Sequence, residues 1–169
     1  MAIKHVLFSA LLLLVVACQP VMDREQQQGS KLAVEVLYAS QQCGYSQANP
    51  EATWIDNAQQ LEASIKKIQH NMPGGKVINL PKLDFKHEIV LLVEMGQQPT
   101  LGYRIELSES DSLIVKQGLS QLTLDWVQPS AGSIVAQIVS SPCLLLKLDR
   151  GNYISVQILN RQGIVKAST

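Results

Sequence analysis

Apolar and polar residues alternate along several stretches of this chain, and this period of two predicts β-strands. The first such stretch is Lys31 to Ala39, with β-branched residues at its centre. The run from Ile89 to Met95 is apolar throughout except for Glu94, which is typical of a strand buried on both faces. Further strands are expected at residues 102–107, 119–127, 134–139, 143–148 and 153–159.

One stretch has helical rather than strand spacing. Leu61, Ile65 and Ile68 lie three or four residues apart, which places them on one face of a helix. Asp56 is the expected N-cap, and the cations Lys66, Lys67 and His70 suit the negative end of the helix dipole. The spacing predicts one helix over about residues 57–70.

Many short strands separated by turn residues predict a mainly β fold, either a β-sandwich or a partly open barrel, with one α-helix. The chain has 169 residues, a length that suggests one domain. Only 5% of the residues are aromatic, so the core must be mostly aliphatic. Trp54 and Trp126 are expected to pack into that core rather than to form a ligand platform.

The N-terminus has the pattern of a bacterial lipoprotein signal. A short charged segment precedes an apolar run, residues 6–16, which is shorter than the ~20 residues of a membrane-spanning helix. Val15-Val16-Ala17-Cys18 then resembles a lipobox, so we expect residues 1–17 to be removed and Cys18 to carry lipid. Residues 18–30 predict a flexible tether, and Gln19 resembles the outer-membrane sorting class. The domain proper is expected at 31–169, facing the periplasm.

Lipidation of Cys18 leaves Cys43 and Cys143 as the remaining cysteines. The cell envelope is oxidising, and one pair allows one connectivity, so a Cys43–Cys143 disulfide is expected. Two separately buried thiols are the alternative. The sequence has no pair of closely spaced cysteines and no cluster of His and Cys, which makes a zinc site improbable.

The charges balance, with 14 Lys+Arg against 14 Asp+Glu, and this excludes a typical nucleic-acid binder. Removal of Lys4 with the signal leaves 13 basic and 14 acidic residues, a net charge of −1. A disordered chain is excluded by the 46% hydrophobic content. The membrane is therefore expected to hold the protein through lipid on Cys18 rather than through a basic patch.

No catalytic constellation stands out. Asp84, His87 and either Ser140 or Ser141 could be drawn as a triad, but no Gly-x-Ser-x-Gly element supports it. A solvated turn before a strand explains Asp84 to Glu88 better. No glycine-rich loop precedes a helix, so no nucleotide or other cofactor is expected.

A family resemblance rests on an ordered set of short motifs. Leu83-Asp84-Phe85 precedes the buried strand 89–95, and Gly96 is followed by Gln97-Gln98-Pro99-Thr100-Leu101-Gly102-Tyr103. Pro129 and Gly132 then precede Val135 to Cys143. This order resembles the C-terminal domain family of PrcB-type protease-complex proteins. Leu101 stands where that family has glycine, so the turn geometry is expected to differ.

The resemblance implies a non-catalytic lipoprotein that binds a protein partner and assembles or stabilises a protease or other envelope complex. The element Pro99-Thr100-Leu101-Gly102-Tyr103 also resembles the central loop of chagasin-type peptidase inhibitors, which are immunoglobulin-like sandwiches. In that class the loop blocks a peptidase cleft, so peptidase inhibition is the alternative function.

The residues of this loop allow two interpretations by themselves. Pro99 sets φ for a turn, Gly102 permits close backbone approach, and Tyr103 begins a strand. This is consistent with a structural turn between two core strands. Loops on rigid β scaffolds also often carry binding, so Gln98, Pro99, Thr100, Leu101, Gly102 and Tyr103 are the candidate protein-contact loop.

Overall fold

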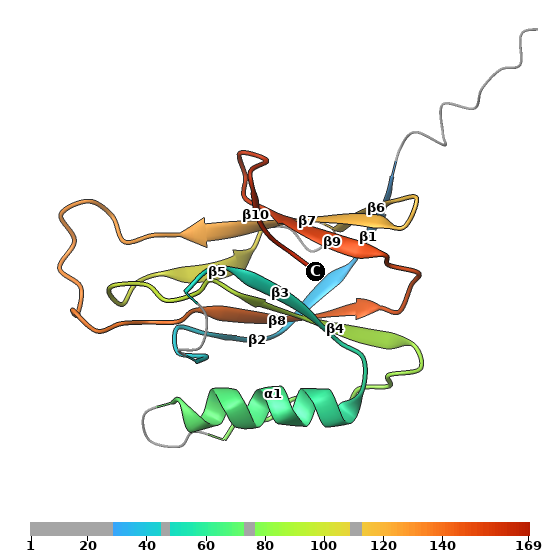
Figure 1. Ribbon diagram of the computed structural model, residues 1–169, viewed down its shortest axis with the longest axis horizontal. Helices are drawn as coiled ribbons and strands as arrows, with labels where there is room; N and C mark the ends of the chain where they lie inside the picture. The colour runs from blue at the N-terminus through green and yellow to red at the C-terminus, as the bar shows by residue number, and fades with distance from the viewer. Residues whose placement is uncertain (1–28, 45–47, 73–76, 109–112) are drawn as a thin grey trace, which may run out of the picture.

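The computed structural model describes residues 29–44, 48–72, 77–108 and 113–169 (Figure 1). These residues form ten strands and one helix. In chain order they are β1 (Ser30–Leu32), β2 (Val34–Ser40), β3 (Glu51–Ile55), α1 (Ala58–His70), β4 (Glu88–Glu94), β5 (Arg104–Leu107), β6 (Leu113–Lys116), β7 (Leu119–Val127), β8 (Cys143–Asp149), β9 (Ser155–Leu159) and β10 (Val165–Ser168).

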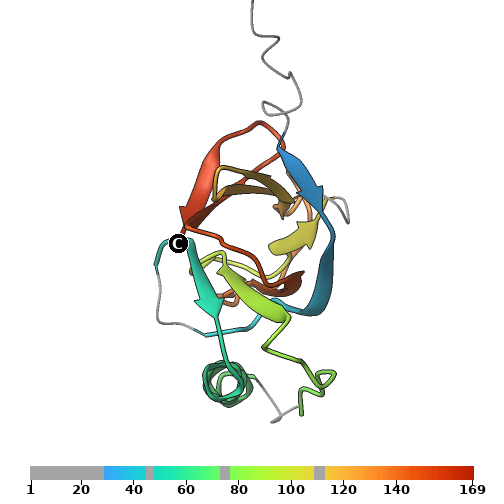
Figure 2. The same cartoon turned by 90° about the vertical axis from the view of Figure 1, so that its right-hand side faces the viewer.

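The strands form two sheets that pack face to face, with the helix beneath one of them (Figure 2). The four-stranded sheet has the order β2-β8-β4-β3 and is antiparallel throughout. The six-stranded sheet has the order β1-β6-β7-β9-β10, with β5 beside β7, and its β7–β9 pair is parallel. The described strands therefore form a sandwich rather than a closed barrel. This confirms the expected mainly β fold with one helix.

Strand β4 is apolar on both faces because the sheet that holds it is covered on both sides. Leu91 and Val93 belong to the core between the sheets. Val90 and Leu92 belong to a second cluster, between the four-stranded sheet and α1. The apolar run from Ile89 to Met95 therefore forms a strand that is buried on both faces, as predicted.

The helix begins one residue later than expected. Asn57, not Asp56, is the N-cap, and its side-chain oxygen accepts from the backbone N–H of Gln60 at 2.9 Å. The Gln60 side chain accepts in return from the backbone N–H of Asp56 at 2.8 Å. The prediction of Asp56 as the N-cap was wrong. Asp and Asn are both good N-cap residues, and the reciprocal bonds with Gln60 place the start of the helix after Asn57.

The strand predicted at residues 134–139 is absent. The segment has the right alternation, but it lies beyond the end of β7, where no neighbouring strand pairs with it continuously. Alternation reports which side chains can face a core, and it does not supply a hydrogen-bonding neighbour. Three short strands, β3, β6 and β10, were not predicted. The stretch 31–39 is divided between the two sheets at Ala33, so β1 and β2 are separate strands.

None of the helical segments in the described ranges is both long and apolar enough to cross a membrane.

Candidate protein-contact site

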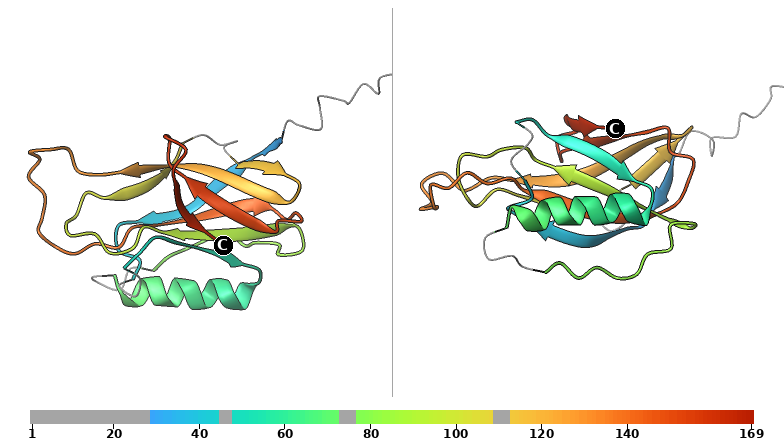
Figure 3. Two further views of the ribbon diagram at one scale, coloured as in Figure 1. Left: turned by 45° about the horizontal axis from the view of Figure 1, so that its top comes forward. Right: turned by 60° about the horizontal axis from the view of Figure 1, so that its bottom comes forward.

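The predicted contact loop lies at one end of the sandwich, beside a second long connection (Figure 3). We call residues 97–103, between β4 and β5, the tip loop. Residues 128–140, between β7 and β8, are called the tip arm. The two segments project together beyond the strands, at the left of Figure 1. The structure therefore brings the predicted loop next to a segment that the sequence had assigned to a strand.

Four hydrogen bonds join the tip loop to the tip arm. Gln98 and Ser140 exchange both backbone bonds, at 2.8 and 2.9 Å, as one isolated antiparallel bridge. The backbone N–H of Leu101 donates to the carbonyl of Ala136 at 3.1 Å. The buried hydroxyl of Ser140 donates to the carbonyl of Thr100 at 2.6 Å. The two segments thus hold each other without forming a regular ladder.

Gly102 gives the tip loop a backbone conformation that other residues rarely adopt. Its φ is +94°, a backbone region that side chains strongly disfavour. A Cβ at this position would lie 3.1 Å from Cγ of Pro129 and 3.4 Å from Cγ1 of Val135, both in the tip arm. The loop therefore needs glycine for its geometry and for close packing against the arm. Leu101 does not carry this strain, since Gln117 is the only non-glycine residue with positive φ in the described ranges.

The six residues of the predicted loop face different surroundings. Pro99 is exposed, while Gln98, Thr100, Leu101 and Gly102 are half-buried. The half-buried Tyr103 packs against the core between the sheets. Its ring therefore supports the loop from below, and Gln97 and Pro99 are the parts of the tip loop that face outward most.

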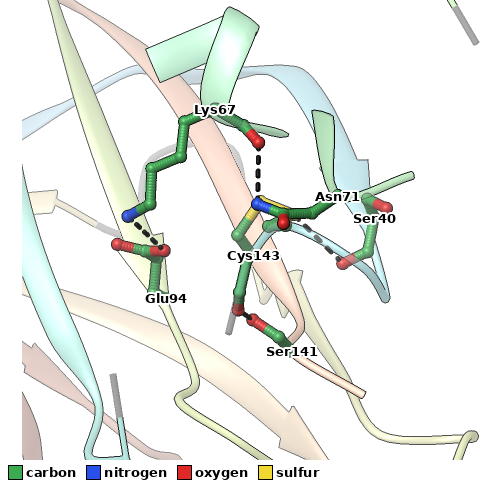
Figure 4. Close-up of polar contacts among 8 residues, drawn as sticks. Ser40, Lys67, Asn71, Glu94, Ser141 and Cys143 are labelled. Atoms are coloured by element: carbon green, nitrogen blue, oxygen red, sulfur yellow. Dashed lines mark hydrogen bonds and ion pairs between the residues drawn. A yellow bond between two sulfur atoms is a disulfide. The ribbon is translucent and has the colours of Figure 1, made fainter. Parts of the chain in front are cut away.

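A disulfide lies at the base of the tip (Figure 4). Cys43 and Cys143 are bonded, with Cα atoms 5.8 Å apart, and both are buried. Ser141 lies beside the pair. Its hydroxyl donates to the carbonyl of Gly44, and its carbonyl accepts from the N–H of Cys43 at 2.8 Å. The disulfide thus ties the chain just after β2 to the chain where the tip arm enters β8.

Two glutamine side chains extend this base toward the tip. The side-chain oxygen of Gln41 accepts from the N–H of Gly102 at 3.3 Å. The side-chain nitrogen of Gln42 donates to the carbonyl of Val139 at 3.2 Å. The segment after β2 therefore contacts both the tip loop and the tip arm, which sequence reasoning had not foreseen.

A buried carboxylate lies near the disulfide, on the helix side of the four-stranded sheet (Figure 4). Glu94 is only 7% exposed, and Nζ of Lys67 in α1 lies 3.6 Å from its carboxylate. The side-chain amide of Asn71 donates to the carbonyl of Lys67 at 2.8 Å, at the end of that helix. Burial of a charge is costly without a partner, so this pair compensates Glu94 and has a structural role.

The surface of the tip is uncharged and includes several exposed apolar side chains. The two uncharged stretches, residues 95–103 and 126–146, include the whole tip loop and tip arm. Ile134 is fully exposed, and Ile138 and Val139 are about half exposed, at 54% and 46%. The sequence had predicted a strand over these residues.

The catalytic candidates are not brought together. His87 lies just before β4, and Ser141 lies two residues before β8. These two strands are antiparallel, so that Glu88 at the start of β4 faces Asp149 at the end of β8, and Glu94 faces Cys143. The two residues therefore lie at opposite ends of the same strand pair. The Nδ1 of exposed His87 is 2.9 Å from Asp84. This contact and the backbone N–H of Lys86 hold the pKa of Asp84 below its usual range.

The remaining predictions concern core packing and metals. Trp54 and Trp126 pack against the core between the sheets, as expected, and Trp54 stacks on Tyr153 with ring centroids 5.4 Å apart. No group of three His, Cys, Asp or Glu side chains suited to a metal occurs among the described residues. Cys18 and the predicted signal lie outside the described residues.

These features define a class of protein: a two-sheet β-sandwich with a helix over one sheet and an uncharged loop pair at one end. Residues 89–149 of this chain match the family model described as PrcB C-terminal. The matched region runs from β4 to β8 and contains the tip loop, the tip arm and Cys143. The family resemblance drawn from the sequence is therefore confirmed. Neither a curated protein nor a solved structure matches the chain significantly.

Proposed function

We propose that this protein is a bacterial envelope lipoprotein whose domain binds another protein without catalysis. In this role it assembles or stabilises a protease or another envelope complex. The observation that carries the proposal is the match of residues 89–149 to the PrcB C-terminal family. The matched region contains the surface with the geometry of a contact site, the tip.

The tip suits protein binding because it combines a rigid base with an exposed apolar surface. The disulfide and the Ser140 bridge restrain the two segments, so little conformational entropy remains to be lost on binding. Exposed apolar residues such as Ile134 and Ile138 provide the surface to be buried. A contact loop on a β scaffold is a common arrangement for recognition.

The membrane attachment in this proposal is lipid on Cys18, with residues 18–30 as tether and the outer membrane as the site, on its periplasmic face. We expect the full chain to fractionate with membranes, and Cys18→Ala to release the protein into the soluble periplasmic fraction. Mass spectrometry of the mature N-terminus gives an independent measurement. A Cys18→Ala protein that remains in the membrane fraction would contradict lipid anchoring.

Protein binding is tested by affinity purification of the full chain from detergent-solubilised envelopes. The tip variant Ile138→Asp is compared with Ile164→Asp, a matched control because Ile138 and Ile164 are similarly exposed, at 54% and 57%. Ile164 lies in the turn between β9 and β10. We expect a defined complex to co-purify with the wild type and the control and to be lost with Ile138→Asp. Equal recovery with both variants would exclude the tip as the contact site.

Peptidase inhibition is the second candidate function, favoured by the projection of the tip loop and tip arm together from one end of the sandwich. Titration of the purified domain against papain-like peptidases separates the two functions. An inhibitor would show tight stoichiometric inhibition that Gly102→Trp abolishes, because the substitution displaces Pro129 and the loop. If peptidase activity is unaffected and a large partner co-purifies, the assembly role is supported.

A further inference from the structure

The tip arm has backbone groups that are not used within the domain. Of the residues from Val135 to Val139, only Ala136 takes part in a backbone–backbone hydrogen bond, through its carbonyl. The carbonyls of Val135 and Val139 accept only from glutamine side chains, Gln137 and Gln42. Within the described ranges, none of the backbone N–H groups from Ile134 to Val139 has a hydrogen-bond partner. The arm therefore carries backbone donors that are available to another chain.

The unused groups of Val135 and Gln137 lie on the side of the arm that faces away from the tip loop. In an extended chain, the backbone groups of successive residues point to opposite sides. Ala136 and Ser140, both even-numbered, bond to the tip loop at Leu101 and Gln98. Val135 and Gln137 consequently direct their N–H and C=O groups outward. A strand added along this outer side would bond to the N–H and C=O groups of alternate residues of the arm.

The chemistry of the surroundings restricts what can bind to this edge. No Lys, Arg, Asp or Glu occurs from residue 126 to residue 146 or from 95 to 103. A charged segment lying along the arm would lose hydration without gaining an ion pair. An uncharged segment with apolar side chains would bury Ile134 and Ile138, which are exposed in the domain alone. The surface therefore complements an uncharged apolar strand.

The position of the tip favours another protein over the membrane as the occupant. Strand β1 pairs with β6, and β6 pairs with the first half of β7, whereas the tip arm follows the end of β7. Figures 1 and 3 show β1 toward the other end of the molecule from the tip. A tether that continues from β1 to lipid thus enters at the far end. The tip points away from that attachment.

We propose that the tip arm binds an extended, uncharged apolar segment of a partner protein as an added β-strand. The bonds are made by the outward N–H and C=O groups of Val135 and Gln137. This inference rests on the proposed protein-binding function and specifies its mode. Main-chain bonds supply affinity, and the apolar side chains of the arm select the partner segment. Exposed edges of this kind pair readily with a strand from another chain.

The experiment uses the full chain in detergent and an array of capped decapeptides. In the four peptide series, valine alternates with threonine, glutamine, lysine or glutamate. We expect the threonine and glutamine series to bind and the lysine and glutamate series not to bind. Binding should slow amide hydrogen exchange at Val135 and Gln137. No binding, or equal binding of all four series, would overturn the inference.

Proline substitutions test the backbone contacts directly. Gln137→Pro removes an outward N–H, and we expect peptide binding to weaken by about tenfold, the upper range for one lost hydrogen bond. Ala136→Pro removes an N–H that faces the tip loop and is the matched control, with binding retained. Thermal unfolding of both variants verifies that they fold. If Ala136→Pro and Gln137→Pro weaken binding equally, strand addition is wrong.

The outcomes separate this inference from the proposed function. A complex that co-purifies equally with wild type and Gln137→Pro would support protein binding and overturn strand addition. Peptide binding with the predicted pattern, but no complex from envelopes, would support the binding edge and contradict the assembly role. Sedimentation that reveals a dimer disrupted by Gln137→Pro would make a second copy the occupant and overturn the inference.

Discussion

At the scale of single residues, the backbone conformation of a few glycines decides the geometry of the site. Gly96 has a φ of +77° and immediately precedes the tip loop. A Cβ there would lie 2.8 Å from the carbonyl oxygen of Ala48. Gly163 has nearly the same φ, +75°, but no atom lies within 4 Å of its hypothetical Cβ. The two positions therefore separate backbone strain from steric overlap.

We predict that Gly96→Ala destabilises the domain more than Gly163→Ala. Gly163→Ala, the control, is destabilised only by its left-handed backbone conformation, by about 1–2 kcal/mol. Gly96→Ala adds a clash with backbone that cannot move freely, for a total of about 2–4 kcal/mol. Urea denaturation of both variants measures the difference. Equal losses of unfolding free energy in the two variants would show that the backbone at Ala48 moves aside without an energetic penalty.

Asp125 is the residue whose pKa predicts a dependence of stability on pH. The guanidinium of Arg161, followed by the Ser108 hydroxyl, holds the pKa of Asp125 below its usual value against the opposing effect of burial. The carboxyl is more acidic in the folded protein than in the unfolded chain. Its stabilising contribution is therefore complete above the unfolded pKa of about 4 and is lost as pH falls through the folded value.

We expect Asp125→Asn to lower the free energy of unfolding by about 1 kcal/mol near neutral pH. The difference from wild type should shrink below about pH 4, where the wild-type carboxyl also becomes protonated. Denaturant titrations across this pH range measure both effects. Asp149→Asn is the control, since Asp149 is exposed and has no ion pair among the described residues. A difference that does not change with pH would contradict this role of the ion pair.

At the scale of elements, the disulfide joins the ends of two neighbouring strands of the four-stranded sheet at the base of the tip. Cys43 follows β2 and Cys143 begins β8, and the two are separated by 100 residues in the chain. The sequence predicted this pairing from the oxidising compartment and the number of cysteines. It did not predict that the bridge lies under the tip, because the position of a loop depends on how distant strands pair.

We predict that replacing both cysteines with alanine costs about 2–5 kcal/mol of stability. The chain-entropy model attributes this to the long closed loop, whose loss gives the unfolded chain more freedom. Chemical denaturation measures the total effect. Amide exchange at Leu101 and Ser140 should accelerate more than exchange in β7, because the tip lies next to the bridge. Uniform acceleration would show that the disulfide does not act on the tip in particular.

At the scale of the whole molecule, strands β4 and β8 unite two hydrophobic clusters. Leu146 of β8 is buried between the sheets, and Leu145 is buried against the helix side. Both are fully buried. Because consecutive residues of one strand serve the two clusters, the clusters cannot separate without breaking the same strand. The domain is therefore expected to unfold as one cooperative unit.

We predict that Leu145→Ala and Leu146→Ala each cost about 2–5 kcal/mol, as is typical of cavities in a core. Each variant should still show one transition, with tryptophan fluorescence and far-ultraviolet circular dichroism coinciding. Trp54 and Trp126 report on the core between the sheets, while the dichroism includes the helix. Non-coincident curves for Leu145→Ala would show that α1 and its cluster unfold separately.

The sequence by itself determined those features that depend on local pattern. The helix follows from the spacing of Leu61, Ile65 and Ile68, and β4 follows from an apolar run that requires cover on both faces. The mainly β class, the family resemblance and the cysteine pairing were also readable, since they rest on composition, motif order and count. The expected lipidation of Cys18 rests on a local motif in the same way.

Only the tertiary structure decided what became of residues 134–139. Their alternation is that of a strand, but a strand exists only where another chain segment presents hydrogen-bonding groups at the correct distance. The fold ends before such a segment is available and leaves Ile134 and Ile138 exposed, in the arm that bonds to the tip loop. The same pattern that predicts core elsewhere therefore forms the surface of the candidate site here, because burial and pairing depend on neighbours that local sequence does not specify.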